Sequence, residues 1–203
     1  GDNGSDAPAG GTHDIASSAP LRAKKGTHYE GGMRVPFIAS WAKPDPDNTF
    51  QKERPIPSGA INTTDIGVAY DVFTTVLNVA GGDYKEHIVD GIDLSPIFLS
   101  GKGSTANREF LMHFPHSHRS SYFTAFRKGD WKLIYHYDQN SGPSDDKIEL
   151  FNLAADLDES TNLASSNPEK LQEMINAMNA SLEETDAQLP INKGGHPLKK
   201  PKL

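Results

Sequence analysis

Residues 126–137 read FRKGDWKLIYHY and give the clearest structural signal in the chain. Two apolar and aromatic runs flank a compact turn at 128–130, a pattern typical of an antiparallel hairpin with strands at 122–127 and 131–137. Further strands are expected at 110–114 and 148–151, which have the same composition. Trp131 and Tyr135 lie at alternating strand positions, so we expect both in the core rather than on a sugar-binding surface.

A long helix is expected after this sheet. Asn167 and Pro168 form a favourable N-cap and first helical residue. The residues that then recur at helical spacing are apolar: Leu171, Met174, Ile175, Met178 and Leu182. Residues 105–203 are therefore predicted to form a small α+β subdomain, an antiparallel sheet of about four strands with a C-terminal helix.

The first half of the chain, residues 1–104, has a different character. Residues 34–41 (RVPFIASW) predict a short buried strand, and residues 65–80 predict a helix with one buried apolar stripe. A helical turn is expected at 95–100. This half holds too little apolar material to close its own core, so we expect it to complete a larger α/β domain.

Composition excludes several classes of protein. The 203 residues include 20 basic and 27 acidic side chains, a formal charge of −7, which argues against a nucleic-acid-binding surface. The absence of cysteine removes disulfides, thiolate metal sites and thiol nucleophiles from this chain. No apolar run reaches the length of about 18 residues that a membrane span needs.

The chain opens with Asp2-Asn3-Gly4, which places two hard oxygen donors beside a flexible glycine. Such donors suit Ca²⁺ or Mg²⁺ better than a soft metal ion. The same three residues are also a common turn sequence, so this pattern alone leaves both interpretations open.

A second candidate site lies in residues 20–32, PLRAKKGTHYEGG. Lys25 precedes a glycine in a loop, where a compact ammonium group can approach a tetrahedral oxyanion. Glu30 could orient that lysine or the backbone. The alternative is a solvated surface loop that happens to carry two lysines.

Taken together, these segments resemble the C-terminal portion of a type I sulfatase, a member of the alkaline phosphatase superfamily. The resemblance rests on Asp2-Asn3-Gly4 and on PLRAKKGTHYEGGMRVPFIASW, residues 20–41, about twenty residues later. It continues in the same order through YDVFTTVLNVAGG, VDGIDLSPIFLSG, FRKGDWKLIYHY and IELFNLAADLDESTNLA. It implies that residues 1–104 complete an alkaline-phosphatase-like catalytic α/β domain, followed by the small subdomain at 105–203.

The resemblance also implies roles for individual residues. Asp2 and Asn3 match two ligands of the active-site Ca²⁺, for which Mg²⁺ is an alternative, and Lys25 matches the lysine that contacts the sulfate. Lys24 matches no functional position. In the family the nucleophile is a formylglycine, expected in a missing N-terminal part of the same polypeptide. The isolated chain is accordingly expected to be inactive.

Three other groups of residues have side chains that are candidates for catalysis or metal binding. Ser18 lies in a Ser-x-Pro-x-Arg pattern that formally fits the formylglycine motif, but it falls inside the block that precedes the sulfate-contacting lysine, so we reject it. Histidines at 113, 116 and 118 are poorly spaced for zinc; the resemblance suggests substrate contact by His116 or His118, with a structural role as the alternative. The acidic residues at 156, 158 and 159 are expected in a solvated turn.

The expected parent protein is a hydrolase of sulfate esters, acting on a carbohydrate or small alcohol. Two alternatives remain: a phosphatase or phosphonate hydrolase of the same superfamily, and a non-catalytic glycan-binding or structural fragment. The family implies export, to a bacterial periplasm or the extracellular space, with which the absence of cysteine is compatible.

Overall fold

The computed structural model describes residues 1–5, 17–84, 86–100, 105–116, 122–137 and 147–202, and these form two compact units. One unit comprises Gly1–Val35 and Glu109–Leu203, and the other comprises Pro36–Arg108. The predicted boundary at residue 104 lies close to the second crossing between units, but residues 1–35 group with the sheet rather than with 36–108. The assignment of residues 1–104 to one catalytic domain therefore stays a prediction.

The helices and strands that these units contain are α1 (Glu30–Met33), α2 (Thr49–Glu53), α3 (Asp71–Val79), α4 (Ser95–Ser100), β1 (Glu109–Phe114), β2 (Phe123–Lys128), β3 (Trp131–His136), β4 (Ile148–Asn152) and α5 (Pro168–Glu184). The four strands form one antiparallel sheet in the order β1-β2-β3-β4. Lys128 pairs with Trp131 to close the predicted hairpin, and Gly129 takes the positive φ of 57° that this tight turn needs. The predicted sheet of four strands is confirmed.

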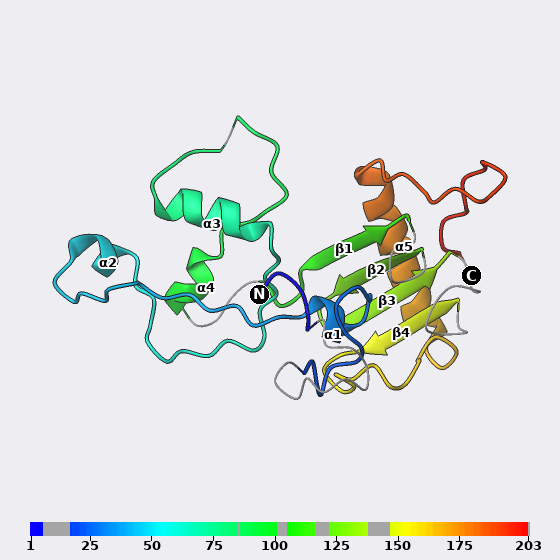
Figure 1. The fold of residues 1–203 in the computed structure, drawn as a ribbon, viewed down its shortest axis with the longest axis horizontal. Coiled ribbons are helices and arrows are strands. Elements are labelled where there is room, and N and C mark those ends of the chain that lie inside the picture. The colour runs from blue at the N-terminus through cyan, green and yellow to red at the C-terminus, as the bar shows by residue number, and fades with distance from the viewer. Residues whose placement is uncertain (6–16, 85, 101–104, 117–121, 138–146, 203) are drawn as a thin grey trace. The chain divides into compact units, whose positions relative to one another are not determined.

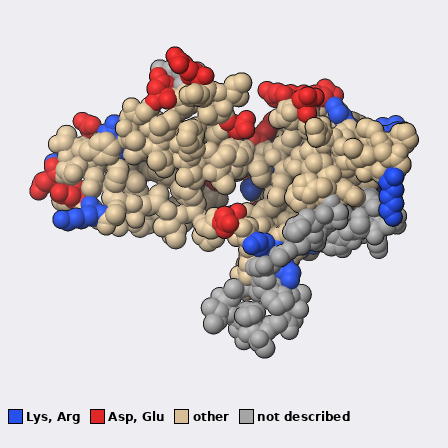
Figure 2. Space-filling model, turned by 45° about the horizontal axis from the view of Figure 1, so that its top comes forward, with Lys and Arg blue, Asp and Glu red and all other residues tan. Residues whose placement is uncertain are grey.

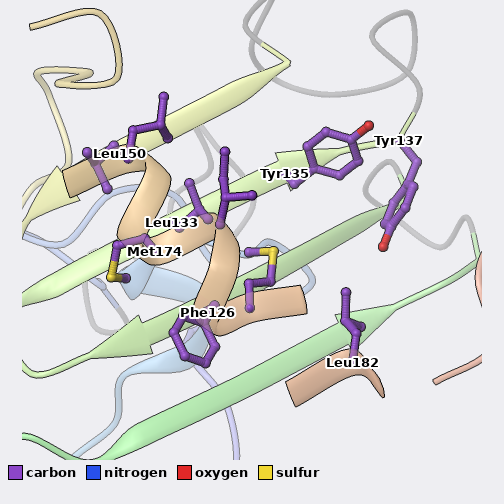
Figure 3. Packing of buried hydrophobic residues seen from close by; sticks show 10 residues of the cluster. Phe126, Leu133, Tyr135, Tyr137, Leu150, Met174 and Leu182 are labelled. Atoms are coloured by element: carbon purple, nitrogen blue, oxygen red, sulfur yellow. The ribbon is translucent and has the colours of Figure 1, made fainter. Parts of the chain in front are cut away.

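Helix α5 covers one face of this sheet (Figure 1). Side chains at alternate strand positions, including Phe126, Leu133 and Leu150, pack against it (Figure 3). All five apolar residues predicted for the helix are buried, and Tyr135 belongs to the same core. The prediction of one covering helix is therefore confirmed.

The opposite face of the sheet is also buried. Phe123, Ile134 and Phe151 form a second apolar cluster there, which includes Tyr29 from the residue before α1. Antiparallel sheets commonly leave one face in water, and here neither face of β3 is solvated. Polar side chains that point to this second face must therefore find partners within the protein.

The predicted buried strand at 34–41 is wrong. These residues form no strand, and the side chains of Phe37 and Ile38 are 58% and 88% exposed. The physical reason is that a strand needs a neighbour for its backbone hydrogen bonds, and among the described residues this stretch has no strand partner.

The predicted helix at 65–80 is shorter than expected. Helix α3 begins at Asp71, whose carboxylate accepts hydrogen bonds from the backbone N–H groups of Val68 (2.8 Å) and Ile92 (3.0 Å). These bonds fix the preceding residues in a non-helical path. The expected buried stripe is also wrong, because Phe73 and Val76 are mainly exposed.

The helical turn expected at 95–100 is confirmed as α4. Within the part of the chain that the structure describes, no helix is long and apolar enough to cross a membrane. On the face drawn in Figure 2, the coloured Lys and Arg side chains are scattered rather than gathered into one patch.

The packing of α5 gives a prediction for stability. Met178 is fully buried against the sheet, so Met178→Ala should lower the free energy of unfolding by about 2–5 kcal/mol through lost burial and a residual cavity. Gln172→Ala, on the exposed side of the same helix, should change it by less than about 0.5 kcal/mol. Urea unfolding followed by circular dichroism measures both; equal effects would contradict the core assignment.

Candidate functional site

The N-terminal segment runs alongside α1. The backbone N–H of Gly4 donates to the carbonyl of Gly32 at 3.0 Å. A Cβ atom at Gly4 would lie 1.8 Å from the carbonyl oxygen of Gly31, so only glycine allows this approach. Asp2 is exposed and Asn3 is half-buried. The segment that carries both predicted metal ligands therefore lies along α1 and the residues that follow it, with Gly4 against Gly31 and Gly32 and Gly1 against Val35.

The loop that carries Lys24 and Lys25, the lysine loop, folds back onto the N-terminal segment. The backbone N–H of Lys25 donates to the carbonyl of Ser5 at 3.0 Å, which brings Lys25 beside the segment that carries Asn3. Gly26 takes a positive φ of 85°, and the Thr27 hydroxyl donates to the Lys24 carbonyl at 2.7 Å. Residues twenty positions apart are thus joined by a backbone hydrogen bond.

The pair Gly31-Gly32 makes this folding possible. A Cβ on Gly31 would lie 2.4 Å from the carbonyl oxygens of Arg22 and Ala23, and one on Gly32 would lie 2.4 Å from that of Thr27. The N–H of Gly31 also donates to the Arg22 carbonyl at 2.8 Å. The glycines therefore serve close packing between α1 and the lysine loop.

Glu30 does not pair with Lys25. Its side chain is buried, and it accepts a hydrogen bond from the ammonium of Lys132 on β3 at 2.9 Å. The guanidinium of Arg127 lies 3.6 Å from its other carboxylate oxygen. From sequence, Glu30 was expected to orient either Lys25 or the backbone. Its contacts favour the second role, because they hold α1 against the sheet.

Lys132 is completely buried and lies between two carboxylates. Its Nζ is 2.9 Å from Glu30 and 2.7 Å from Glu159, and a Glu159 oxygen also accepts the Glu30 N–H at 2.6 Å. Burial is the largest single influence and opposes ionisation of Glu30, but the charge and hydrogen bond of Lys132, together with the charges of Arg127 and Arg34, outweigh it and hold the pKa of Glu30 below its usual range. For Glu159, burial outweighs the same charge and raises the pKa.

The position of Glu159 corrects the solvated-turn prediction. Asp156 does organise a turn, since its carboxylate accepts the N–H groups of Ser160 (3.0 Å) and Thr161 (2.9 Å). Glu159, however, is fully buried and has a positive φ of 51°. Sequence reasoning missed its partner, although a lysine between Trp131 and Leu133 in an apolar strand was a signal.

A second buried polar group lies on the same face of the sheet. Nε2 of His136 on β3 is 2.8 Å from Glu149 on β4, and the hydroxyl of Tyr29 donates to both oxygens of that carboxylate at 2.9 and 3.1 Å. The ring of His28 lies 4.7 Å from that of His136, centroid to centroid. The guanidinium of Arg22 lies 3.6 Å from Glu149.

Burial has a large effect on His28. Its side chain is fully buried, and desolvation, aided by the nearby charges of His136, Lys132 and Arg22, lowers its pKa from 6.5 to about 2. The imidazole is therefore neutral at any pH at which the protein is expected to work.

Sequence reasoning did not single out His28, and the three histidines that it considered differ in their surroundings. The two ring nitrogens of His113 lie 2.8 Å from the Thr124 hydroxyl and 2.8 Å from the Gln188 carbonyl, which indicates a structural role. His116 is exposed, with its ring 4.2 Å from that of Phe114. His118 lies outside the described residues.

Ser18, which was rejected as a formylglycine position, is hydrogen-bonded within the protein. Its hydroxyl donates to the Gly31 carbonyl at 3.0 Å.

Substitution of Lys132 tests how much its two buried ion pairs contribute to the stability of the unit that contains α1. Lys132→Met should lower the free energy of unfolding by about 3–5 kcal/mol, because it leaves buried carboxylates without their cation. Lys128→Met removes the exposed pair with Glu109 and should cost less than about 1 kcal/mol. Urea unfolding of both variants makes the comparison; a small effect at Lys132 would show that the buried pair is not needed.

The lowered pKa of His28 predicts a pH dependence. Below about pH 6.5 the unfolded chain binds a proton at this position and the folded chain does not, so stability is fully present above pH 6.5 and falls with pH. The loss should approach about 1.4 kcal/mol per pH unit. His28→Gln should remove this slope between about pH 6 and about pH 4.5 in chelator-containing buffer. Urea unfolding at several pH values in that range measures the slope of the unfolding free energy against pH. The same slope in both proteins would contradict the lowered pKa of His28.

No family profile matches the chain, but individual relatives do. A sulfatase of Formosa agariphila is 30% identical over 170 residues, which is 78% of this chain and 28% of the relative. Human arylsulfatase A is 30% identical over 176 residues, which is 76% of this chain and 32% of that protein. The chain thus spans less than a third of the length of these relatives.

Solved structures agree with these relatives. Ps i-CgsB in complex with a neocarrahexaose matches 82% of this chain and 32% of its own with a TM-score of 0.60 and 25% identity. A structure of BT4656 with its substrate D-glucosamine-2-N,6-O-disulfate matches 65% of this chain and 27% of its own with a TM-score of 0.51; at 21% identity it supports the fold alone. The chain therefore belongs to the sulfatases and corresponds to a C-terminal portion of such a protein.

Proposed function

We propose that this chain is part of an enzyme that hydrolyses sulfate esters, in which Lys25 contacts the sulfate group and Asp2 and Asn3 bind Ca²⁺. The observation that carries the proposal is the pair of backbone hydrogen bonds from Lys25 to Ser5 and from Gly4 to Gly32. They bring the cationic residue and the two oxygen donors into one neighbourhood, although the sequence separates them.

The donors fit a hard divalent cation. Asp2 offers a carboxylate and Asn3 a carboxamide oxygen, which suit Ca²⁺ and, with stricter geometry, Mg²⁺. Two donors do not complete a coordination sphere, so the remaining ligands are proposed to come from another part of the same polypeptide. A bound cation would supply Lewis-acid polarisation of the sulfate oxygens.

The residues of this chain hold and orient the sulfate. An ammonium group on Lys25 neutralises charge on the sulfate and on the oxygen that leaves with the alcohol. The loop that carries it is fixed by its backbone bonds to Ser5 and by the packing of Gly31 and Gly32. That rigidity is what a preorganised electrostatic site needs.

The nucleophile is proposed to lie elsewhere in the polypeptide, as a formylglycine. This chain has no cysteine, and the hydroxyl of Ser18 is bonded to the backbone of α1. The isolated chain should accordingly have no sulfatase activity and should bind Ca²⁺ poorly, because Asp2 and Asn3 supply only two of the donors that Ca²⁺ needs. Submillimolar Ca²⁺ affinity of the isolated chain, measured by calorimetry, would contradict this part of the proposal.

A sulfated carbohydrate is the proposed substrate class. Ps i-CgsB, which is 25% identical to this chain, was solved with a neocarrahexaose, and this supports the choice. His116, exposed at the end of β1, and His118 are the proposed substrate contacts from this chain. We further propose that the protein is exported, to a bacterial periplasm or the extracellular space.

Lys25 provides the direct test. In the longer protein that contains this chain, Lys25→Ala should lower kcat/KM for an aryl sulfate by at least about 100-fold. Lys24→Ala should change it by less than about threefold, since only the backbone carbonyl of Lys24 is used in the loop. Equal activity of the Lys25→Ala and unchanged proteins would overturn the assigned role.

Assays of the longer protein also distinguish two alternatives to a sulfatase function. A faster rate on a matched aryl phosphate than on the aryl sulfate would favour a phosphatase or phosphonate hydrolase of the same superfamily. Failure of the longer protein to turn over either ester, together with binding of a sulfated oligosaccharide, would favour a glycan-binding or structural protein.

A further inference from the structure

A group of metal-binding side chains lies apart from the Asp2–Lys25 neighbourhood. His28, His136 and Glu149 come from the loop before α1, from β3 and from β4. Each offers one ligand atom, and these atoms all lie within 4.8 Å of one another. All three residues are buried, with exposures of 0%, 0% and 2%.

We propose that His28, His136 and Glu149 form a buried structural site for one zinc ion. Two imidazole nitrogens and one carboxylate oxygen are a ligand set that Zn²⁺ uses, whereas Ca²⁺ prefers oxygen donors alone. The site therefore differs from the proposed Ca²⁺ site both in its residues and in the metal ion that it selects.

The arrangement is already close to what an ion requires. Nε2 of His136 and the Glu149 oxygen that accepts its hydrogen bond are 2.8 Å apart, so a small separation would admit a zinc ion between them. Zinc would take the place of the proton in this hydrogen bond, and Nε2 would bind the ion through its lone pair.

The surroundings orient the carboxylate. The hydroxyl of Tyr29 donates to Glu149 at 2.9 and 3.1 Å, the kind of outer hydrogen bond that holds a metal-ligating carboxylate in place. The rings of Tyr29 and Phe123 lie 4.4 and 4.6 Å from that of His28, centroid to centroid. The three side chains are buried among these rings, so a bound ion would be shielded from water.

Nearby charges determine how tightly the proposed site is expected to bind zinc. Arg22 lies 3.6 Å from Glu149 and opposes a cation, while the charge of Lys132 is balanced by Glu30 and Glu159. We therefore expect affinity in the range of about 1–10 µM rather than that of a four-thiolate site. The ion would cross-link the α1 loop to β3 and β4, and so would fix the loop that carries Lys25.

Equilibrium dialysis of the purified 203-residue chain against Zn²⁺, after removal of metals with chelator, tests the site. One zinc per chain is expected, with binding weakened at least about tenfold in His28→Gln and in Glu149→Gln. His196→Gln and Glu184→Gln, both exposed in the same unit, are matched controls and should bind as the unchanged chain does. Binding that is absent, or equal in all four variants, would overturn the proposal.

A second measurement covers variants that fail to fold. Co²⁺ bound to the unchanged chain should give the visible absorption bands of a four- or five-coordinate site, displaced by Zn²⁺ but not by Ca²⁺, and Zn²⁺ should raise the Tm. A spectrum of hydrated Co²⁺ with no change in Tm would show that the three side chains are only a hydrogen-bonded network. Neither experiment measures sulfatase activity or Ca²⁺ binding, so the two proposals fail separately.

Discussion

The burial of Lys132 between Glu30 and Glu159 is the interaction on which the rest of the first unit depends. A fully buried ammonium is tolerated only when it is paired, and here its partners come from α1 and from the turn after β4. Helix α1 has four residues and no side-chain cap at its start, so it is far too short to be stable alone. The ion pairs and the apolar packing of Tyr29 hold it against the sheet.

Docking of α1 then determines where the candidate site forms. Gly31 and Gly32 accept the lysine loop at distances that no side chain would allow, and Gly4 approaches the same backbone. This packing brings the loop that carries Lys25 against the segment that carries Asn3, where the Lys25 N–H donates to the Ser5 carbonyl. The geometry of the proposed sulfate site therefore depends on an ionic contact of α1 within the protein interior.

The polar groups on this face of the sheet illustrate how one buried surface can carry different chemistry. The Lys132 cluster is balanced by charge, whereas His136 and Glu149 are joined by a hydrogen bond beside the neutral ring of His28. Both clusters sit where an antiparallel sheet would ordinarily meet water. The α1 segment excludes that water, and it thereby turns ordinary strand residues into buried ionisable groups.

The sequence alone determined the four-stranded sheet and α5, because alternation within 126–137 and helical spacing after Pro168 are local patterns with one stable solution. Through its resemblance it also pointed to the sulfatases and to Asp2, Asn3 and Lys25. Only the tertiary structure decided that residues 34–41 are exposed and that Glu159 is buried, because burial depends on which partners a segment meets. The pairing of Lys132 with Glu30, 102 positions away, was equally beyond local pattern, since no periodicity specifies which distant charges will share one interior.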